Sequence, residues 1–192
     1  MEKFELDVSA LGHLSDEEFF HFCRANDHLR IERDAAQKII IMAPTGSLSG
    51  NRNINLSADF VIWNRQHRKG YLFDSSAGFR LPNGATRSPD VAFVLKDRWE
   101  ALSSDQQEVF APLCPDFVLE LRSKNDSLID LQAKMEECMA NGASLGWLID
   151  PYERQVYVYD AQQPTALHED FTQPLRGKYF MEDFEITLNT IL

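Results

Sequence analysis

The sequence has little of what marks a disulfide-bonded, zinc-binding or membrane protein. Its 192 residues include three cysteines, Cys23, Cys114 and Cys138. An odd number of widely spaced cysteines supports neither a disulfide framework nor a Cys-x-x-Cys zinc site, so we expect small core side chains. No apolar run is long enough to span a membrane, and the first residues lack the basic and apolar segments of a secretory signal. We therefore predict a cytoplasmic protein.

Positive charge is also scarce. Lysine and arginine number 19 against 30 acidic residues, which gives a formal net charge of −11 and argues against indiscriminate binding to nucleic acid. A local basic cleft is still compatible with this balance. Apolar and charged residues occur in the proportions of a globular protein rather than a disordered one. The length is that of one domain, and we predict a single domain over residues 1–192.

Apolar periodicity and turn residues predict alternating helices and strands. Helices are expected at 15–25, 50–67, within 97–110, and from Ser127 to Gly142. Strands are expected at 28–33 and 38–43 as a hairpin, then at 71–73, 78–81, 91–95, 117–121, 145–149, 155–159 and 184–188. The strand, helix and strand over 117–149 form a crossover unit, so these two strands should be parallel.

Two carboxylates stand where a strand would bury or present them. Glu120 lies in the middle of an apolar strand, where a charge requires a cation or a metal as partner. Asp116 lies four residues earlier, about 13 Å away along an extended strand, too far to share one ion with Glu120. Asp90 enters the strand at 91–95 and could meet Glu120 if the two strands pair in register. The alternative for Asp90 is a turn cap after Pro89.

Two cations lie near Glu120 in the expected fold. Arg122 follows on the same strand face, and a carboxylate beside a cation suits metal-dependent hydrolysis of a phosphodiester. A simple ion pair between Glu120 and Arg122 is the alternative. Lys134 lies at the margin of the apolar face of its helix, from which it could reach the carboxylates. It could equally pair with Asp130 on the helix surface.

Several segments carry a resemblance when they are taken together. They are Met42–Gly46, Ser88–Ala92, Val118–Ser123, Lys134 in its helix, and Gly146–Pro151. In this combination the chain resembles the restriction endonucleases of the Uma type, within the PD-(D/E)XK nuclease superfamily, over about residues 28 to 160. The resemblance implies an α/β fold with a restriction-endonuclease-like core, in which a mixed sheet is flanked by helices and preceded by a β-hairpin.

The resemblance also implies a site. Asp90 and Glu120 match the two metal-binding acids of the superfamily, and the Leu121 carbonyl is a third expected ligand. Arg122 stands where the superfamily has lysine, and arginine cannot lose its proton to act as a base. Lys134 is expected to take that role, so the predicted catalytic residues are Asp90, Glu120, Arg122 and Lys134. The helix that begins near Asn51 lacks early acidic residues that would support the metal.

The leading hypothesis is therefore an endonuclease that cleaves DNA and depends on Mg²⁺, with Mn²⁺ as an alternative ion. One rival is an inactive protein that keeps the nuclease fold as an interaction module. Another is a nuclease that acts on RNA or on nucleotides. The helix at 50–67 is apolar on two sides, which predicts either burial of both sides or burial of one side and a homodimer contact on the other.

Overall fold

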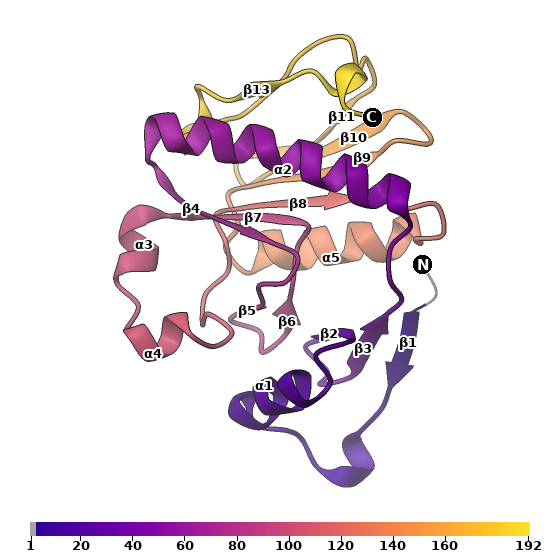
Figure 1. The fold of residues 1–192 in the computed structure, drawn as a ribbon, viewed down its shortest axis with the longest axis vertical. Coiled ribbons are helices and arrows are strands. Elements are labelled where there is room, and N and C mark those ends of the chain that lie inside the picture. The colour runs from indigo at the N-terminus through magenta and orange to yellow at the C-terminus, as the bar shows by residue number, and fades with distance from the viewer. Residues whose placement is uncertain (1–2) are drawn as a thin grey trace.

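A six-stranded mixed sheet forms the centre of the computed structural model, which describes residues 3–192, with Lys3 and Leu11 described by their backbone alone. The strand order is β11-β10-β9-β8-β7-β4 (Figure 1). Its strands are β4 (Gly70–Asp74), β7 (Val91–Leu95), β8 (Phe117–Leu121), β9 (Leu145–Asp150), β10 (Gln155–Asp160) and β11 (Gln163–His168). Strands β8 and β9 run parallel and the other neighbours antiparallel, which confirms the predicted crossover.

Two long helices cover opposite faces of this sheet (Figure 1). Helix α2 (Ser47–His67) buries one side, including Phe60, in a core shared with the C-terminal part of the chain. Helix α5 (Leu128–Ala140) buries Met135 in a second core on the other face. Since both faces of the sheet are covered, its central strands are apolar on both sides, as a buried sheet requires. The predicted α/β fold with a mixed sheet flanked by helices is confirmed.

A second, smaller sheet lies beside the first and is built mainly from the N-terminal part of the chain (Figure 1). Its strand order is β1-β3-β2-β6-β5. The strands are β1 (Lys3–Leu6), β2 (Arg30–Arg33), β3 (Ile39–Met42), β5 (Phe79–Arg80) and β6 (Thr86–Arg87). The predicted hairpin is β2 and β3, and the short β6 pairs with β2 at its other edge. The chain runs from β6 through Pro89 directly into β7, so this sheet fixes the entry of Asp90.

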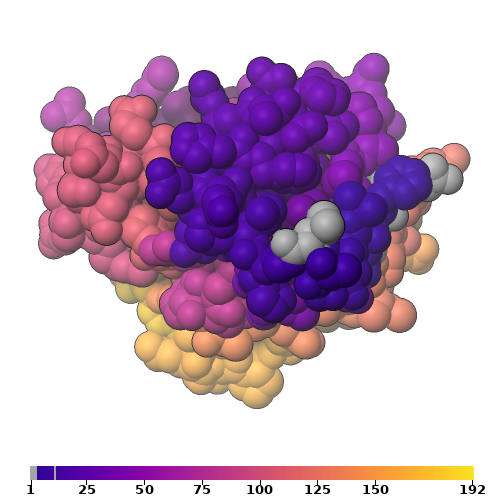
Figure 2. All heavy atoms as spheres, turned by 90° about the horizontal axis from the view of Figure 1, so that it is seen from below, coloured from indigo at the N-terminus to yellow at the C-terminus, as the bar shows by residue number. Residues whose placement is uncertain are grey.

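Helix α1 (Asp16–Ala25) covers the second sheet. It begins with the predicted capping box, in which the Ser15 hydroxyl accepts from the Glu18 amide at 3.2 Å and Glu18 accepts from the Ser15 amide at 2.7 Å. Its Phe19 is fully buried beneath the guanidinium of Arg33, 4.6 Å from the ring centre. Seen from below, the indigo N-terminal segment forms much of this face, beside the pink segment around residue 100 (Figure 2).

Several short elements complete the fold. They are helices α3 (Lys96–Glu100) and α4 (Ser104–Gln107), strands β12 (Leu175–Arg176) and β13 (Glu185–Ile186), and 3-10 turns at Ser9–Leu11, Tyr179–Met181 and Leu188–Thr190. In place of the predicted edge strand over 184–188, the two-residue β13 pairs with β12 in a separate ribbon. Strands β1 and β11 were not predicted. Strand β1 alternates polar and apolar residues but is only four residues long, and β11 contains Pro164 and does not alternate.

The sequence also led to predictions about membrane-spanning segments and about the cysteines, and residues 3–192 can be compared with both. Within them, no helix combines the length and the apolar character needed to cross a membrane. All three cysteines are free thiols. Cys114 and Cys138 are buried core side chains, as expected, whereas Cys23 on α1 is partly buried.

Asp160 ties the C-terminal segment to the end of β10. Its buried carboxylate accepts from the Lys178 ammonium at 2.6 Å, from the Gln162 amide at 2.9 Å and from the Tyr179 hydroxyl. Burial by itself raises the pKa of Asp160, but the hydrogen bonds from Lys178 and Tyr179 outweigh it and lower the pKa to about 2. The folded protein therefore favours the ionised form.

We predict that Asp160→Asn lowers the free energy of unfolding at pH 7 by about 1.5–3 kcal/mol, the usual contribution of hydrogen bonds to a charged group. The pKa of Asp160 in the folded protein, about 2, lies below its ordinary value of 3.8, so the stabilisation is present above pH 3.8 and is lost as pH falls toward 2. Urea unfolding at several pH values measures the difference. Glu153→Gln, at an exposed turn residue, is the control. A deficit in Asp160→Asn that persists unchanged at pH 2 would contradict the prediction.

Candidate active site

The two predicted metal-binding carboxylates meet at one end of β7 and β8. These strands are antiparallel, with Val91 opposite Leu119 and Ala92 opposite Val118. The same register carried one residue further places Asp90 opposite Glu120. Directly opposed residues have Cβ atoms about 5 Å apart, and both side chains lie on the face of the sheet that α5 covers. The register therefore meets the condition that the sequence had left open.

Asp90 is held in a fixed orientation by three neighbours. Its Oδ2 accepts from the Leu121 amide at 2.9 Å, and its Oδ1 accepts from Asn53 of α2 at 3.1 Å. The Arg30 guanidinium lies 3.8 Å from Oδ1. The bond to the Leu121 amide joins Asp90 to the backbone of the strand that carries Glu120. Asp90 is thus more than a turn cap, because its carboxylate points into the strand pair.

Lys134 lies between two buried carboxylates. Its Nζ is 2.6 Å from Glu120 Oε1 and 2.7 Å from Glu32 Oε1, and it also donates to the Ser88 carbonyl at 3.4 Å. Lys134 comes from α5, Glu120 from β8 and Glu32 from β2. The ammonium group therefore joins the helix, the central sheet and the second sheet. The alternative of an exposed helix pair with Asp130 does not describe this side chain, which is 11 % exposed.

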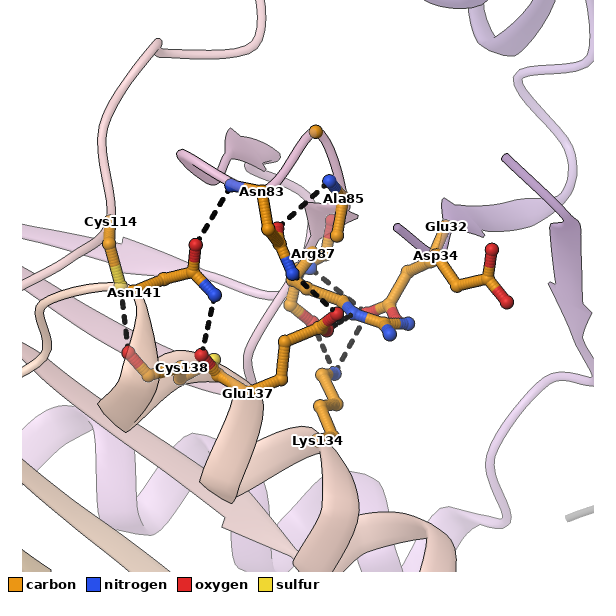
Figure 3. A network of polar contacts seen from close by, with 12 residues as sticks. Glu32, Asp34, Asn83, Ala85, Arg87, Cys114, Lys134, Glu137, Cys138 and Asn141 are labelled. Carbon is orange, nitrogen blue, oxygen red and sulfur yellow. Dashed lines mark hydrogen bonds and ion pairs between the residues drawn. The ribbon is translucent and has the colours of Figure 1, made fainter. Parts of the chain in front are cut away.

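Figure 3 shows the ion pairs around Glu32. Besides Lys134, the Glu32 carboxylate accepts from Arg87 at 3.2 Å and from the Ser88 amide at 2.9 Å. Arg87 in turn donates to Glu137 of α5 at 2.5 Å. Glu32 thus has three donors, whereas the buried Glu120 Oε1 accepts no hydrogen bond and has only the ion-pair contact with Lys134 among the described residues.

The two carboxylates beside Lys134 differ in proton affinity. Burial raises the pKa of Glu120 to about 8, and the charges of Asp90 and Glu32 add to this, although Lys134 lowers it. Burial acts in the same direction on Glu32, but Lys134 and Arg87 outweigh it and lower its pKa. For Lys134, burial lowers the pKa, yet Glu120 and Glu32 raise it overall. At neutral pH Lys134 is therefore charged, Glu32 is ionised, and Glu120 is the carboxyl that retains a proton.

A cavity of about 500 Å³ opens over these groups. Of the described residues that line it, eight are acidic and three are basic. The acids are Glu5, Glu32, Asp34, Asp90, Glu120, Asp126, Asp130 and Glu137, and the bases are Arg30, Arg87 and Lys134. Such a cavity favours cations and repels an unscreened phosphate. Any phosphodiester that enters it needs a metal ion to offset this charge.

The residues present suit a magnesium ion. Asp90 and Glu120 offer two opposed carboxylates, and Glu120 Oε1 is buried without a hydrogen bond. Within residues 3–192, no three His, Cys, Asp or Glu side chains converge as a complete metal cage. This is compatible with Mg²⁺, which is usually held by one or two carboxylates and keeps several waters. Leu121 also lines the cavity, although its carbonyl remains only a predicted ligand.

The structure does not bring every candidate into this cavity. The Arg122 guanidinium donates to the fully buried Asp150 at 2.5 Å and to the Asp126 carbonyl at 3.2 Å, so neither alternative for it, a site cation or a partner of Glu120, describes its contacts. Asp116 accepts from the Leu95 amide and from Arg98, at 2.8 and 2.7 Å, near the opposite end of β8. A role for Arg122 in catalysis stays a prediction.

Sequence reasoning missed Glu32. It lies between Ile31 and Arg33 in the short and mostly charged strand β2, where it looks like a solvent-facing residue. Strand alternation places it on the same face as Arg30, which gives no sign of burial. It is nevertheless 2 % exposed, because α5 and Arg87 close over it. Only the packing of the second sheet against α5 identifies Glu32 as the partner of Lys134.

We predict that Glu120→Gln separates metal binding from stability. The pKa of Glu120 in the folded protein, about 8, lies above the ordinary value of 4.5 for a glutamate. Between these two pH values, folded Glu120 therefore holds a proton that the unfolded chain releases. The stability of the metal-free protein should therefore fall as pH rises from 4.5 to 8, and this fall should be reduced in Glu120→Gln. Calorimetric Mg²⁺ affinity should fall at least tenfold. Thermal unfolding in EDTA across this pH range measures the stability.

Two variants serve as controls for Glu120→Gln. Glu136→Gln removes an exposed carboxylate from α5 and should behave like the parent in both measurements. Glu32→Ala should cost on the order of 3 kcal/mol of stability, because it removes the buried carboxylate that pairs with both Lys134 and Arg87. Unchanged Mg²⁺ affinity in Glu120→Gln would show that the metal binds elsewhere.

Comparisons with known proteins bear on the family and the fold of the chain. A family model described as "Uma2: Putative restriction endonuclease" matches residues 16–189. Among solved structures, the chain is similar to a crystal structure from Anabaena variabilis titled as a putative nuclease belonging to DUF820. The TM-score is 0.72 at 19 % identity, and the match covers 84 % of this chain and 88 % of that one. No curated protein matches the chain. Since the family model spans most of the sequence, the chain belongs to the Uma2 family of restriction-endonuclease-like proteins.

Proposed function

We propose that this protein is a Mg²⁺-dependent endonuclease that hydrolyses phosphodiester bonds of DNA. The observation that supports the proposal best is the register of β7 and β8, which sets Asp90 opposite Glu120, with the Lys134 ammonium 2.6 Å from Glu120. Two carboxylates and one buried cation on a common sheet face suit binding of a divalent ion beside a phosphate. Membership of the Uma2 family supports the same reaction class.

In this proposal Asp90 and Glu120 hold Mg²⁺ or Mn²⁺, with the Leu121 carbonyl as a third ligand. A divalent ion in such a site supplies Lewis acidity toward the phosphate and a bound water of lowered pKa. Glu120 must release its proton for the ion to bind, which its raised pKa allows near pH 8. Asn53 and the Leu121 amide keep Asp90 oriented while this exchange occurs.

Lys134 is proposed to stabilise negative charge that develops on the phosphate. Its raised pKa keeps it protonated, so it serves as a cation rather than as a general base. Glu32 is the positioning residue for Lys134, because its carboxylate also accepts from the ammonium, at 2.7 Å. If Glu120 held the ion, the pair between Lys134 and Glu32 would keep the cation in the cavity.

We predict that the purified protein nicks supercoiled plasmid in Mg²⁺ and that EDTA stops the reaction. Asp90→Asn and Glu120→Gln should each reduce the rate at least 100-fold, because each removes a metal ligand, and Lys134→Met should do the same by removing the cation. Glu136→Gln is the matched control on α5 and should retain the parent rate. Gel assays in which DNA and RNA of the same sequence compete for the protein show which of the two polymers it cleaves preferentially.

Two outcomes would contradict the assignment. Metal-dependent nicking that survives both Asp90→Asn and Glu120→Gln would show that another site or a contaminant cleaves the DNA. No cleavage, together with no calorimetric binding of Mg²⁺ or Mn²⁺ at millimolar concentration, would favour the rival interaction module. Cleavage of RNA or nucleotides but not of DNA would contradict the proposed substrate and leave the proposed active site unchanged.

A homodimer through α2 is a second proposal, supported by the exposure of one side of that helix. Ile54 and Ile62 are 64 % and 54 % exposed, whereas Phe60 on the other side is fully buried. Isolated exposed apolar residues are common, but these two lie eight residues apart on one helix face, two turns along the axis.

We predict that sedimentation velocity shows a dimer for the parent and a monomer for the double variant Ile54→Glu and Ile62→Glu. The physical reason is that two charges placed in an apolar contact cannot be buried without partners. Tyr152→Glu, at an exposed aromatic residue outside this helix, is the control. A parent that sediments as a monomer at high micromolar concentration would end the proposal.

A further inference from the structure

A second hollow of about 470 Å³ lies next to the acidic cavity. Its walls come from α1, from the loop after β4, and from the segment after α4. Viewed from below, the indigo segment that carries α1 lies beside the pink segment that follows α3 (Figure 2). The proposed reaction makes no use of this hollow.

Aromatic rings form much of its lining. Phe20, Phe73, Trp99 and Phe110 all contribute, and each is partly exposed. Phe20 and Phe110 meet edge to face at 5.1 Å between ring centres, and Phe73 lies 4.7 Å from Trp99. The rings therefore form two pairs around one space and leave ring surface open to a flat partner. Aromatic surface of this kind stacks well on any nucleobase.

The hollow shares part of its wall with the candidate active site. Arg30 and Met42 line both spaces. The Arg30 guanidinium is 3.8 Å from Asp90, and its buried Nε has no hydrogen-bond partner among the described residues. A chain with a phosphate beside Asp90 and a ring among the aromatics would pass Arg30. An arginine at that point suits the phosphate that links them.

Charge also separates the two spaces. The first cavity is strongly acidic, whereas the charged residues that line the hollow are Arg24, Asp27, Arg30 and Glu108, two of each sign. A balanced, aromatic hollow suits an uncharged planar ring better than a phosphate. An apolar peptide would also fit the lining, but it would give no partner to the buried Nε of Arg30, which lines both spaces.

We propose that the hollow binds an unstacked nucleobase that flanks the phosphodiester to be cleaved, with Arg30 on the intervening phosphate. The proposal rests on the proposed nuclease function. It makes the preferred substrate single-stranded or locally unpaired nucleic acid, because bases inside a duplex are stacked on one another and cannot enter. Phe20, Phe73, Trp99 and Phe110 act here as binding residues and take no part in the chemical step.

The test measures binding and cleavage of a labelled 12-nucleotide single strand and of its duplex. Fluorescence anisotropy is recorded in Mg²⁺ and again in EDTA, and gels follow cleavage. We expect the parent to bind the single strand at least tenfold more tightly than the duplex, the order that stacking of one base provides. Ser76→Trp, which fills the hollow from an exposed position of its wall, should abolish this preference. Phe20→Ala should reduce it.

Leu167→Ala, at an exposed position of the edge strand β11, is the control and should leave the preference unchanged. Equal binding of single strand and duplex by the parent would overturn the proposal. A preference for the single strand that persists in both Ser76→Trp and Phe20→Ala would also overturn it. That second result is expected if the hollow receives an apolar peptide. A preference that the variants remove, in a protein that cleaves neither substrate, would support the hollow and refute the nuclease function. Cleavage without any preference for the single strand would support the nuclease function and refute the binding of a nucleobase in the hollow.

Discussion

The position of one buried ammonium group, that of Lys134, organises this protein. It contacts Glu120 of the central sheet and Glu32 of the second sheet, and it comes from the helix that covers both. Three elements that are far apart in sequence are thereby joined at one point. Charged groups are stable in the protein interior only when they are paired and hydrogen-bonded. Here Arg87, Glu137 and the Ser88 amide complete the network. The apolar cores on either side supply the packing, and this network fixes how the second sheet meets the first.

The same arrangement explains why the candidate site is prepared for a cation. Glu32 has enough donors to stay ionised, whereas Glu120 has Lys134 alone and holds a proton when no metal is present. Asp90 lies opposite with both carboxylate oxygens already oriented by hydrogen bonds. A divalent ion would therefore replace a proton at Glu120 rather than break a saturated network. Because the cavity around it is acidic, as is the whole protein with its net charge of −11, the proposed reaction needs a metal ion to offset this charge before a phosphodiester can enter.

Much of the fold follows from local patterns that sequence can express. The capping box at Ser15, the strong apolar strands at 91–95, 117–121 and 145–149, and the crossover between the last two are all local features, and each is present in the structure. The exposed strand β11 was missed because it contains Pro164 and does not alternate, and β1 was missed although its four residues do alternate polar and apolar side chains. Arg122 shows a limit of such patterns, because neighbours on one strand face need not share a partner. Its guanidinium turns to Asp150, fully buried at the end of the adjacent strand.

The sequence by itself determined the α/β fold, the family and the identity of Asp90, Glu120 and Lys134 as candidates, because these depend on short motifs and on periodicity along the chain. Only the tertiary structure decided that Asp90 lies opposite Glu120, since strand register depends on pairing across 30 residues of intervening chain. It alone revealed Glu32 as the second partner of Lys134 and placed the aromatic hollow beside Arg30. The physical reason is the same in each case. Burial and ion pairing arise between elements, and no local pattern in an exposed-looking strand encodes which helix will cover it.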